Sequence, residues 1–214
     1  MFSISKIINC ICGVTLLFFI FLMLKLSLPY FTFKYDVDFL LTKQKIIHIK
    51  LWRYAFYVHI FLSTITLIAG LFQFSNYILK HYKKLHRAIG YVYVITVCGF
   101  AGPSGLIMSF YANGTIWAKT SFVILSVLWI TFTSIALLKA KQLKLKEHKK
   151  WMLRSFALTL SAITLRLLAF ALPQFVHLNA FDEYTLIAWL SWTVNLVIVE
   201  TLIFVKYKKI ITPA

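Results

Sequence analysis

Acidic side chains are scarce in this chain, which has 6 Asp and Glu against 23 Lys and Arg and a formal net charge of +17 at pH 7. A soluble chain this basic would suggest a nucleic-acid partner. Here the cations flank long apolar runs and form no separate basic surface. No nucleic-acid binding is therefore expected, and the lipid bilayer, with anionic headgroups at the cytoplasmic face, is the expected partner.

The motifs of common enzymes are also missing. No carboxylate pair, nucleophile motif or glycine-rich phosphate loop stands in the sequence. There is no Pro-, Gly- or Ser-rich linker, no low-complexity tail and no obvious repeat. The polar segments are too short to enclose the core of a separate enzyme domain. Hydrolase and transferase chemistry is disfavoured, and any chemistry is expected inside the membrane or at its interfaces.

Cysteine is rare as well, with Cys10 and Cys12 in the first apolar run and Cys98 in the third. A Cys-x-Cys metal or redox site needs further ligands nearby, and none is adjacent in the sequence. Buried structural thiols are the expected role for all three.

What the sequence does contain is six long apolar runs. The chain is 61% hydrophobic, with a mean hydropathy of +0.82. Because a helix needs about 20 residues to cross about 30 Å of hydrocarbon, 214 residues suffice for about six spans. The sequence predicts an all-α, polytopic transmembrane helical bundle forming one integral membrane domain over residues 1–214. The expected spans cover residues 7–28, 54–79, 88–111, 117–138, 151–176 and 184–205.

Lysine and arginine predict the orientation of the bundle. With a cytoplasmic N-terminus, 15 of these residues lie on the inner side and 6 on the outer side. The positive-inside rule therefore predicts that the N- and C-termini are both cytoplasmic. The first run lacks a small-residue cleavage site after it and is expected to remain as a signal anchor. The basic segment from Pro29 to Trp52 is expected near the outer membrane surface.

Two spans carry polar or small residues at helical spacing. The steps of four, three, four and three keep each set on one helix face. In lipid such a face turns toward other helices, either to bind a ligand or simply to pack. The second span contributes His59, Ser63, Thr66, Gly70 and Gln73, and the fifth span contributes Ser155, Thr159, Ala162, Arg166 and Ala169. If the two spans are neighbours, equal depth pairs Arg166 with Ser63 and Thr66, Thr159 with Gly70, and Ser155 with Gln73.

Arg166 is the most distinctive single residue, because a cation near the middle of a membrane costs at least about 2.5–3.5 kcal/mol unless it is paired or hydrated. The only acidic residue within an expected span is Glu200, which lies near the inner end of the last span and is a poor match in depth for Arg166. Arg166 is expected either to bind backbone carbonyls or to bind an anion.

The third span contains a second unusual feature, Gly99-Phe100-Ala101-Gly102-Pro103-Ser104-Gly105. Pro103 removes one backbone hydrogen bond and frees the carbonyl of Gly99. This pattern predicts either a broken helix at a binding site or a kink tolerated by close glycine packing.

Histidines raise the question of haem. His86 and His148 lie at the predicted cytoplasmic ends of the third and fifth spans, and could form an axial pair for a b-type haem. His59 lies deeper and has no histidine at its own depth, so Met108 is its nearest alternative partner. Solvated interfacial histidines are the competing interpretation. The candidate cofactor is haem b, held by His86 and His148 with His59 as a further ligand.

The segments His86-Arg87-Ala88-Ile89-Gly90-Tyr91-Val92-Tyr93 and His148-Lys149-Lys150-Trp151-Met152-Leu153-Arg154-Ser155, with Ala157, Leu158, Thr159 and Arg166, resemble an uncharacterised bacterial family of multi-pass membrane proteins. The family is known only as domain of unknown function two-three-zero-six. The resemblance covers about Trp52 to Phe170, with the span of His59, Gly70 and Gln73 matching the preceding family segment. It implies a bacterial cytoplasmic membrane and supplies no activity.

Three functions remain open on the sequence. The first is a haem-binding transmembrane electron carrier. The second is a transporter or receptor for a small anion or lipid, with Arg166 and the polar residues Ser63, Thr66, Gln73 and Thr159 as its site. The third is a structural accessory subunit whose polar stripes only pack.

Overall fold

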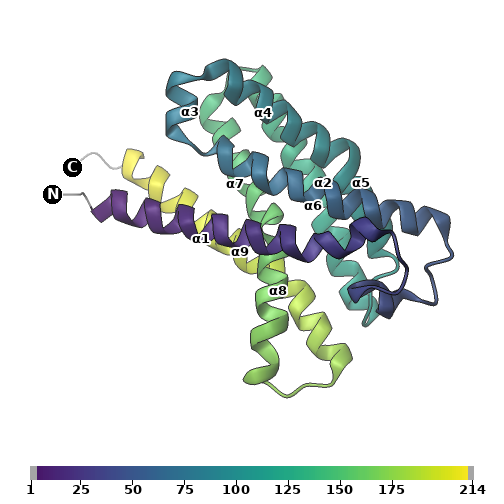
Figure 1. Cartoon of the computed structure of the whole chain (residues 1–214). Coiled ribbons are helices and arrows are strands. Elements are labelled where there is room, and N and C mark those ends of the chain that lie inside the picture. Colours follow the sequence, from purple (N-terminus) through teal and green to yellow (C-terminus); the bar gives the residue numbers. More distant parts are fainter. Residues whose placement is uncertain (1–3, 212–214) are drawn as a thin grey trace.

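The computed structural model describes residues 4–211, with side chains from residue 13 to residue 205. Cys10 and Cys12 therefore have no described side chains. Within residues 4–211 every regular element is helical. Six helical segments are long and apolar enough to cross a membrane, which confirms the predicted all-α, polytopic architecture (Figure 1).

The six spans are built from these elements, in chain order: α1 (Ile4–Ser27); α2 (Lys50–Gln73); α4 (Lys83–Ile95) with η3 (Thr96–Ala101) and α5 (Gly102–Ser109); α6 (Ile116–Lys141); α7 (Leu145–Thr159) with α8 (Ser161–Ala171); and α9 (Ala180–Ile211). The short elements between them are η1 (Leu28–Thr32), η2 (Asp38–Lys43), α3 (Asn76–His81) and η4 (Leu172–Gln174).

The surfaces of these spans suit lipid and not water. Only 17–39% of each apolar window is buried inside the protein, so most of every span faces outward. The outward residues are large and apolar, such as Phe21, Phe170 and Val197, which are 62%, 75% and 65% exposed. A soluble helix would present charged residues on that face. The chain is therefore an integral membrane protein.

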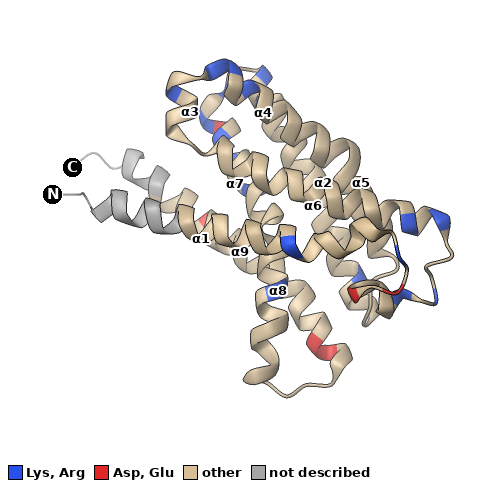
Figure 2. Cartoon of the chain, viewed as in Figure 1, with Lys and Arg blue, Asp and Glu red and all other residues tan. Residues whose placement is uncertain are grey.

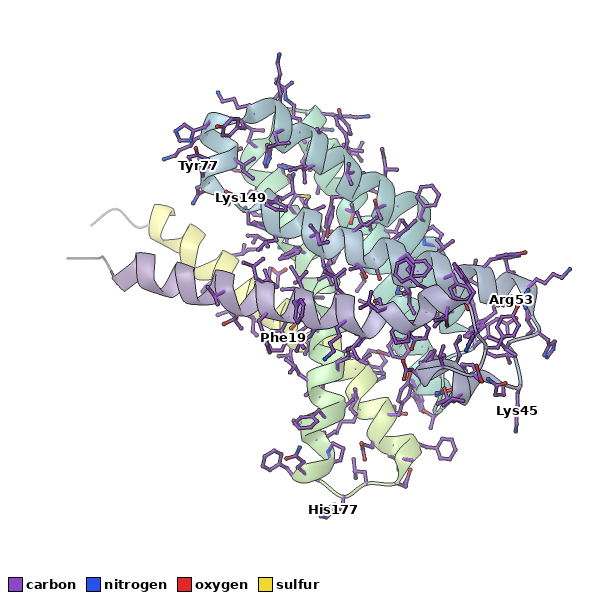
Figure 3. All side chains as sticks on the ribbon, viewed as in Figure 1. Phe19, Lys45, Arg53, Tyr77, Lys149 and His177 are labelled. Carbon is purple, nitrogen blue, oxygen red and sulfur yellow. The ribbon has the colours of Figure 1, made fainter. Side chains whose placement is uncertain are left out.

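The two ends of the bundle differ in composition. We call the end where α1 begins, α9 ends and α3 lies the terminal face, and the end that carries η1, η2 and the α5–α6 loop the opposite face (Figure 1). Cations gather around α3 and the adjoining ends of α4 and α7 (Figure 2). Tyr77 and Lys149 lie at the terminal face, and Lys45 and Arg53 lie at the opposite face (Figure 3).

The second span is shorter than the sequence suggests. It was expected to run to residue 79, but α2 ends at Gln73. Ser75 begins a separate helix, because its hydroxyl oxygen accepts a hydrogen bond from the backbone N–H of Ile78 at 3.3 Å. Residues 76–81 therefore form α3, which connects α2 to α4.

The third span stays helical through its glycine-rich stretch. Between α4 and α5 the backbone forms a π-helical turn, in which the N–H of Gly102 donates to the carbonyl of Val97. Pro103 occupies the first turn of α5, where its missing N–H costs least. The helix is therefore not broken at the glycine-rich stretch, and the extra residue of the π turn accommodates the proline.

The fifth span changes direction at Leu160, although the sequence suggested one continuous helix over residues 151–176. The N–H groups of Ile163 and Thr164 both donate to the Leu160 carbonyl, at 3.0 and 3.1 Å, which tightens the turn where α8 begins. Figure 1 shows α8 and the first half of α9 projecting from the bundle as a hairpin. The polar stripe expected on one straight helix is therefore divided between α7 and α8.

The second and fifth spans are neighbours, as the depth argument assumed. A Cβ on Gly70 of α2 would overlap the ring of Phe156 on α7, so only glycine lets this ring lie against the backbone. Phe156 belongs to the main core, which also contains Tyr93, Val97 and Trp129. This contact sets the spacing between α2 and α7.

The segment between the first two spans covers the opposite face of the bundle. Tyr30, Leu40, Trp52 and Phe56 form its buried cluster. Lys43 ends η2 and is only 4% exposed. Its Nζ donates to the Tyr111 carbonyl and to Asn113 Oδ1, both at 2.6 Å, and so ties η2 to the α5–α6 loop.

Lys43 should make stability depend on pH. Burial, with a contribution from Lys119, lowers the pKa of Lys43 to about 8. Between about pH 8 and 10 the folded protein has lost a proton that the unfolded chain still holds, so the free energy of unfolding rises with pH. Lys43→Met should remove this rise, worth at most about 2 kcal/mol.

Thermal unfolding of the detergent-purified protein across that pH range measures the effect. Lys45→Met is the matched control, because Lys45 is exposed two residues away in the same segment. It should follow the wild type. A difference between wild type and Lys43→Met that is constant with pH would contradict this account of Lys43.

Candidate functional site

A large cavity lies at the terminal face, and we call it the interfacial cavity. Its volume is about 740 Å³. Its walls come from the ends of α2 and α6, from α3, from most of α4 and from the first half of α7. His86 and His148 both line it, so the structure brings the predicted histidine pair to one site. Gln73, a predicted polar residue of the second span, lines the same cavity.

His148 is oriented by a backbone contact. Its Nδ1 lies 2.8 Å from the carbonyl oxygen of Ala136 on α6. A carbonyl only accepts hydrogen bonds, so Nδ1 carries the proton and donates it. Nε2 is then the available nitrogen of the neutral ring. Histidine ligands of metals are commonly oriented through the second nitrogen in this manner.

His86 is less committed to protein contacts. Its Nδ1 is buried and has no hydrogen-bond partner among the described residues. Its backbone carbonyl accepts from Gln73 Nε2 at 2.8 Å, which fixes the first turn of α4 against the end of α2. The imidazoles of His86 and His148 are close enough to interact electrostatically.

The other lining residues of the interfacial cavity include buried or partly buried apolar side chains and exposed cations. Phe74, Val94, Leu137 and Met152 provide apolar surface. The cations Arg87, Lys141 and Lys149 also line the cavity. No cluster of three or more His, Cys, Asp or Glu that could hold a bare metal ion occurs in the described part of the chain.

The smaller cavity lies between the second, fourth and fifth spans, and we call it the central cavity. Its volume is about 70 Å³. The residues that line it include His59, Ser63 and Thr66 of α2, Ser126 and Trp129 of α6, and Thr159, Ser161 and Ala162 of α7 and α8. The two polar stripes predicted from the sequence therefore meet here, with a third wall from α6 that the sequence analysis missed.

The π turn of the third span positions His59. Its Nδ1 lies 2.8 Å from the carbonyl oxygen of Ala101, at the end of the π turn, so Nδ1 is again the protonated nitrogen. The ring also lies against Gly105, where an added Cβ would come within 2.9 Å of His59 Cε1. The glycine-rich stretch thus makes room for a histidine, although the carbonyl involved is Ala101 and not Gly99.

A network of buried hydroxyls separates the two cavities. Tyr93 Oη lies 2.8 Å from Ser155 Oγ and 2.7 Å from Thr159 Oγ1. Ser155 Oγ is 2.7 Å from Thr133 Oγ1. Trp129 Nε1 donates to Thr159 Oγ1 at 3.0 Å. We call these five residues the hydroxyl cluster, which joins α4, α6 and α7 deep inside the protein.

The residue pairs predicted from equal depth in the second and fifth spans are not the pairs that the structure brings together. Thr159 lies with Ser63 and Thr66 at the central cavity, and Phe156 takes the place opposite Gly70. Ser155 and Gln73 belong to different sites, because the fifth span bends at Leu160. Ser126, Trp129 and Thr133, which the sequence analysis missed, follow one another at steps of three and four, so helical spacing on the fourth span could have found them.

Arg166 lies outside both cavities. Its side chain is exposed on α8, and Nη1 donates to the carbonyl of Ala162, one turn earlier, at 2.9 Å. Arg166 still interacts electrostatically with His59 and Tyr30. Glu200 accepts hydrogen bonds of 2.5 and 2.9 Å from Arg154. This agrees with the expectation that Glu200 does not form an ion pair with Arg166.

These features define a class of protein: a six-span helical membrane protein with a histidine-lined cavity at one interface and a small polar cavity in its interior. Over residues 56–203, which include most of the last span, the sequence matches the family described as "Predicted membrane protein (DUF2306)". The chain belongs to this family. No curated protein and no solved structure is significantly similar to it.

Tyr93→Phe tests the hydroxyl cluster. The substitution keeps the ring but removes the hydroxyl shared by Ser155 and Thr159. Leaving buried partners unsatisfied should lower the free energy of unfolding by about 1–3 kcal/mol. The control is Tyr91→Phe, on the same helix and 52% exposed, which should change it by less than about 0.5 kcal/mol. Equal unfolding midpoints for the two variants would show that the cluster adds nothing to stability.

Proposed function

We propose that the interfacial cavity binds a b-type haem between His86 and His148, and that the protein is a membrane electron carrier. The observation that carries the proposal is the pair itself: two imidazoles from α4 and α7 line one cavity and lie within electrostatic range of each other. A six-coordinate b-type haem needs two such axial ligands on facing helices.

The volume of the interfacial cavity is consistent with a bound cofactor. Ligand sites commonly have volumes of about 300–1,000 Å³, and the interfacial cavity has about 740 Å³. α4 and α7 each pack on α2 and α6, so the space between them is kept open. A planar apolar macrocycle would fit between apolar side chains such as Phe74, Val94 and Met152.

The charges and hydrogen bonds of the cavity support the same ligand. Arg87, Lys141 and Lys149 can pair with the two propionates of haem, with Arg87 able to bind a carboxylate in a bidentate manner. The hydrogen bond from His148 Nδ1 to Ala136 leaves Nε2 for iron. The buried, unpartnered Nδ1 of His86 leaves this ring free to reorient toward a ligand. When bound, the haem would supply the one-electron chemistry; the protein holds and orients it.

Absorption spectra of haem-loaded variants test the proposal. The purified wild type should show a sharp Soret band and, after dithionite, the α and β bands of a six-coordinate b-type haem. His86→Ala and His148→Ala should each lose the six-coordinate spectrum and retain less haem. His81→Ala is the matched control, because His81 is exposed and does not line the cavity. A six-coordinate spectrum that survives both cavity variants would exclude this ligand pair.

The membrane and the orientation are part of the same proposal. The family resemblance favours a bacterial cytoplasmic membrane. The lysine and arginine distribution favours an orientation with the terminal face toward the cytoplasm and its cations against anionic headgroups. The haem would then lie at the cytoplasmic interface, where it could exchange electrons with a partner on that side.

Reporter fusions test this orientation. Green fluorescent protein fused after the last residue should fluoresce, because this reporter folds in the cytoplasm. It stays dark when it is exported across the membrane in the unfolded state. Alkaline phosphatase inserted in the segment of residues 33–37, at the opposite face, should be active. A dark terminal fusion with an inactive phosphatase at that segment would reverse the proposed orientation.

A further inference from the structure

The central cavity contains polar atoms whose hydrogen-bonding capacity is unused. Ser126 and Ser161 line it, each 7% exposed, and neither hydroxyl has a partner among the described residues. His59 also lines the cavity, and Nε2 is its one ring nitrogen that is not bonded to Ala101. A water needs only about 10–15 Å³ by this measure, so about 70 Å³ leaves room for a small ligand with water.

The surroundings of this cavity are positive. Arg166 of α8 interacts electrostatically with His59, and none of the described carboxylates pairs with it. The residues contributed by α6 and α7 include no ionisable group, and Tyr30 of η1 interacts with Arg166. Hydroxyl donors in a positive environment select an anion.

The tautomer of His59 determines when its ring can bind an anion. Because Nδ1–H is committed to the Ala101 carbonyl, a neutral ring would present the lone pair of Nε2, which repels an anion. Nε2 can donate to an anion only when the ring is protonated. We propose that the central cavity binds a small inorganic anion such as chloride, and that each bound anion is accompanied by a proton on His59.

This site is separate from the interfacial cavity, and the inference does not depend on haem. The two cavities share no lining residue, and the hydroxyl cluster lies between them. Coupled uptake is electrically neutral, so the ligand brings no net charge into the protein interior. Apparent affinity for chloride should fall about tenfold for each unit of pH above the range in which His59 is protonated.

The test is thermal unfolding of the purified protein as sodium chloride replaces sodium gluconate at constant ionic strength. Two pH values are used, about 5.5 and about 7.5, on either side of the ordinary titration range of imidazole. Chloride should raise the wild-type midpoint in a saturable way, with half-saturation at a much lower concentration at the acidic pH. Gluconate is too large for the cavity and serves as the inert anion.

Three variants separate the site from general salt effects. The double variant Ser126→Ala/Ser161→Ala should lose most of the chloride response. Each single variant should lose part of the response, and the single variants replace the double variant if that protein does not fold. His59→Gln should remove the difference between the two pH values. Thr64→Val is the matched control, because this buried hydroxyl on α2 bonds to the Ile60 carbonyl and does not line the cavity. A chloride response that is absent, independent of pH, or equal in all variants overturns the proposal.

Discussion

The structure depends on one constraint, which is that polar groups inside a membrane must find partners within the protein. The hydroxyl cluster meets this constraint at the centre of the bundle. Tyr93 of α4 reaches Ser155 and Thr159 of α7, while Thr133 and Trp129 of α6 complete the set. Because these contacts come from three spans, they fix how α4, α6 and α7 approach one another. The positions of both cavities follow from that arrangement.

The same constraint explains why the helices bend where they do. The π turn before Pro103 places the Ala101 carbonyl opposite His59. The turn at Leu160 ends α7 just after Thr159 and begins α8 at Ser161, so both side chains line the central cavity. Each irregularity therefore occurs where backbone or side-chain polar groups face the protein interior, which is where a membrane protein can tolerate it.

Several parts of this arrangement could be predicted from the sequence, and the reasons are local. Apolar runs of about 20 residues predict spans, and steps of three and four predict that His59, Ser63 and Thr66 share a face. The proximity of His86 and His148 followed from their position at the same end of two spans. The pairing of Thr159 could not be predicted, because no proline or glycine marks the bend at Leu160. Tyr93 was missed because an aromatic residue in a span usually indicates packing alone.

The central claim is that two histidines at one membrane interface hold a haem, and their surroundings give it a physical basis. His148 is oriented by Ala136, His86 retains an unpartnered buried nitrogen, and cations rim the space between them. The most direct measurement is electron paramagnetic resonance of the oxidised, haem-loaded protein at low temperature. The account predicts the low-spin ferric signal of an iron with two imidazole ligands. A purely high-spin signal, or protein that retains no haem when it is supplied, would contradict it.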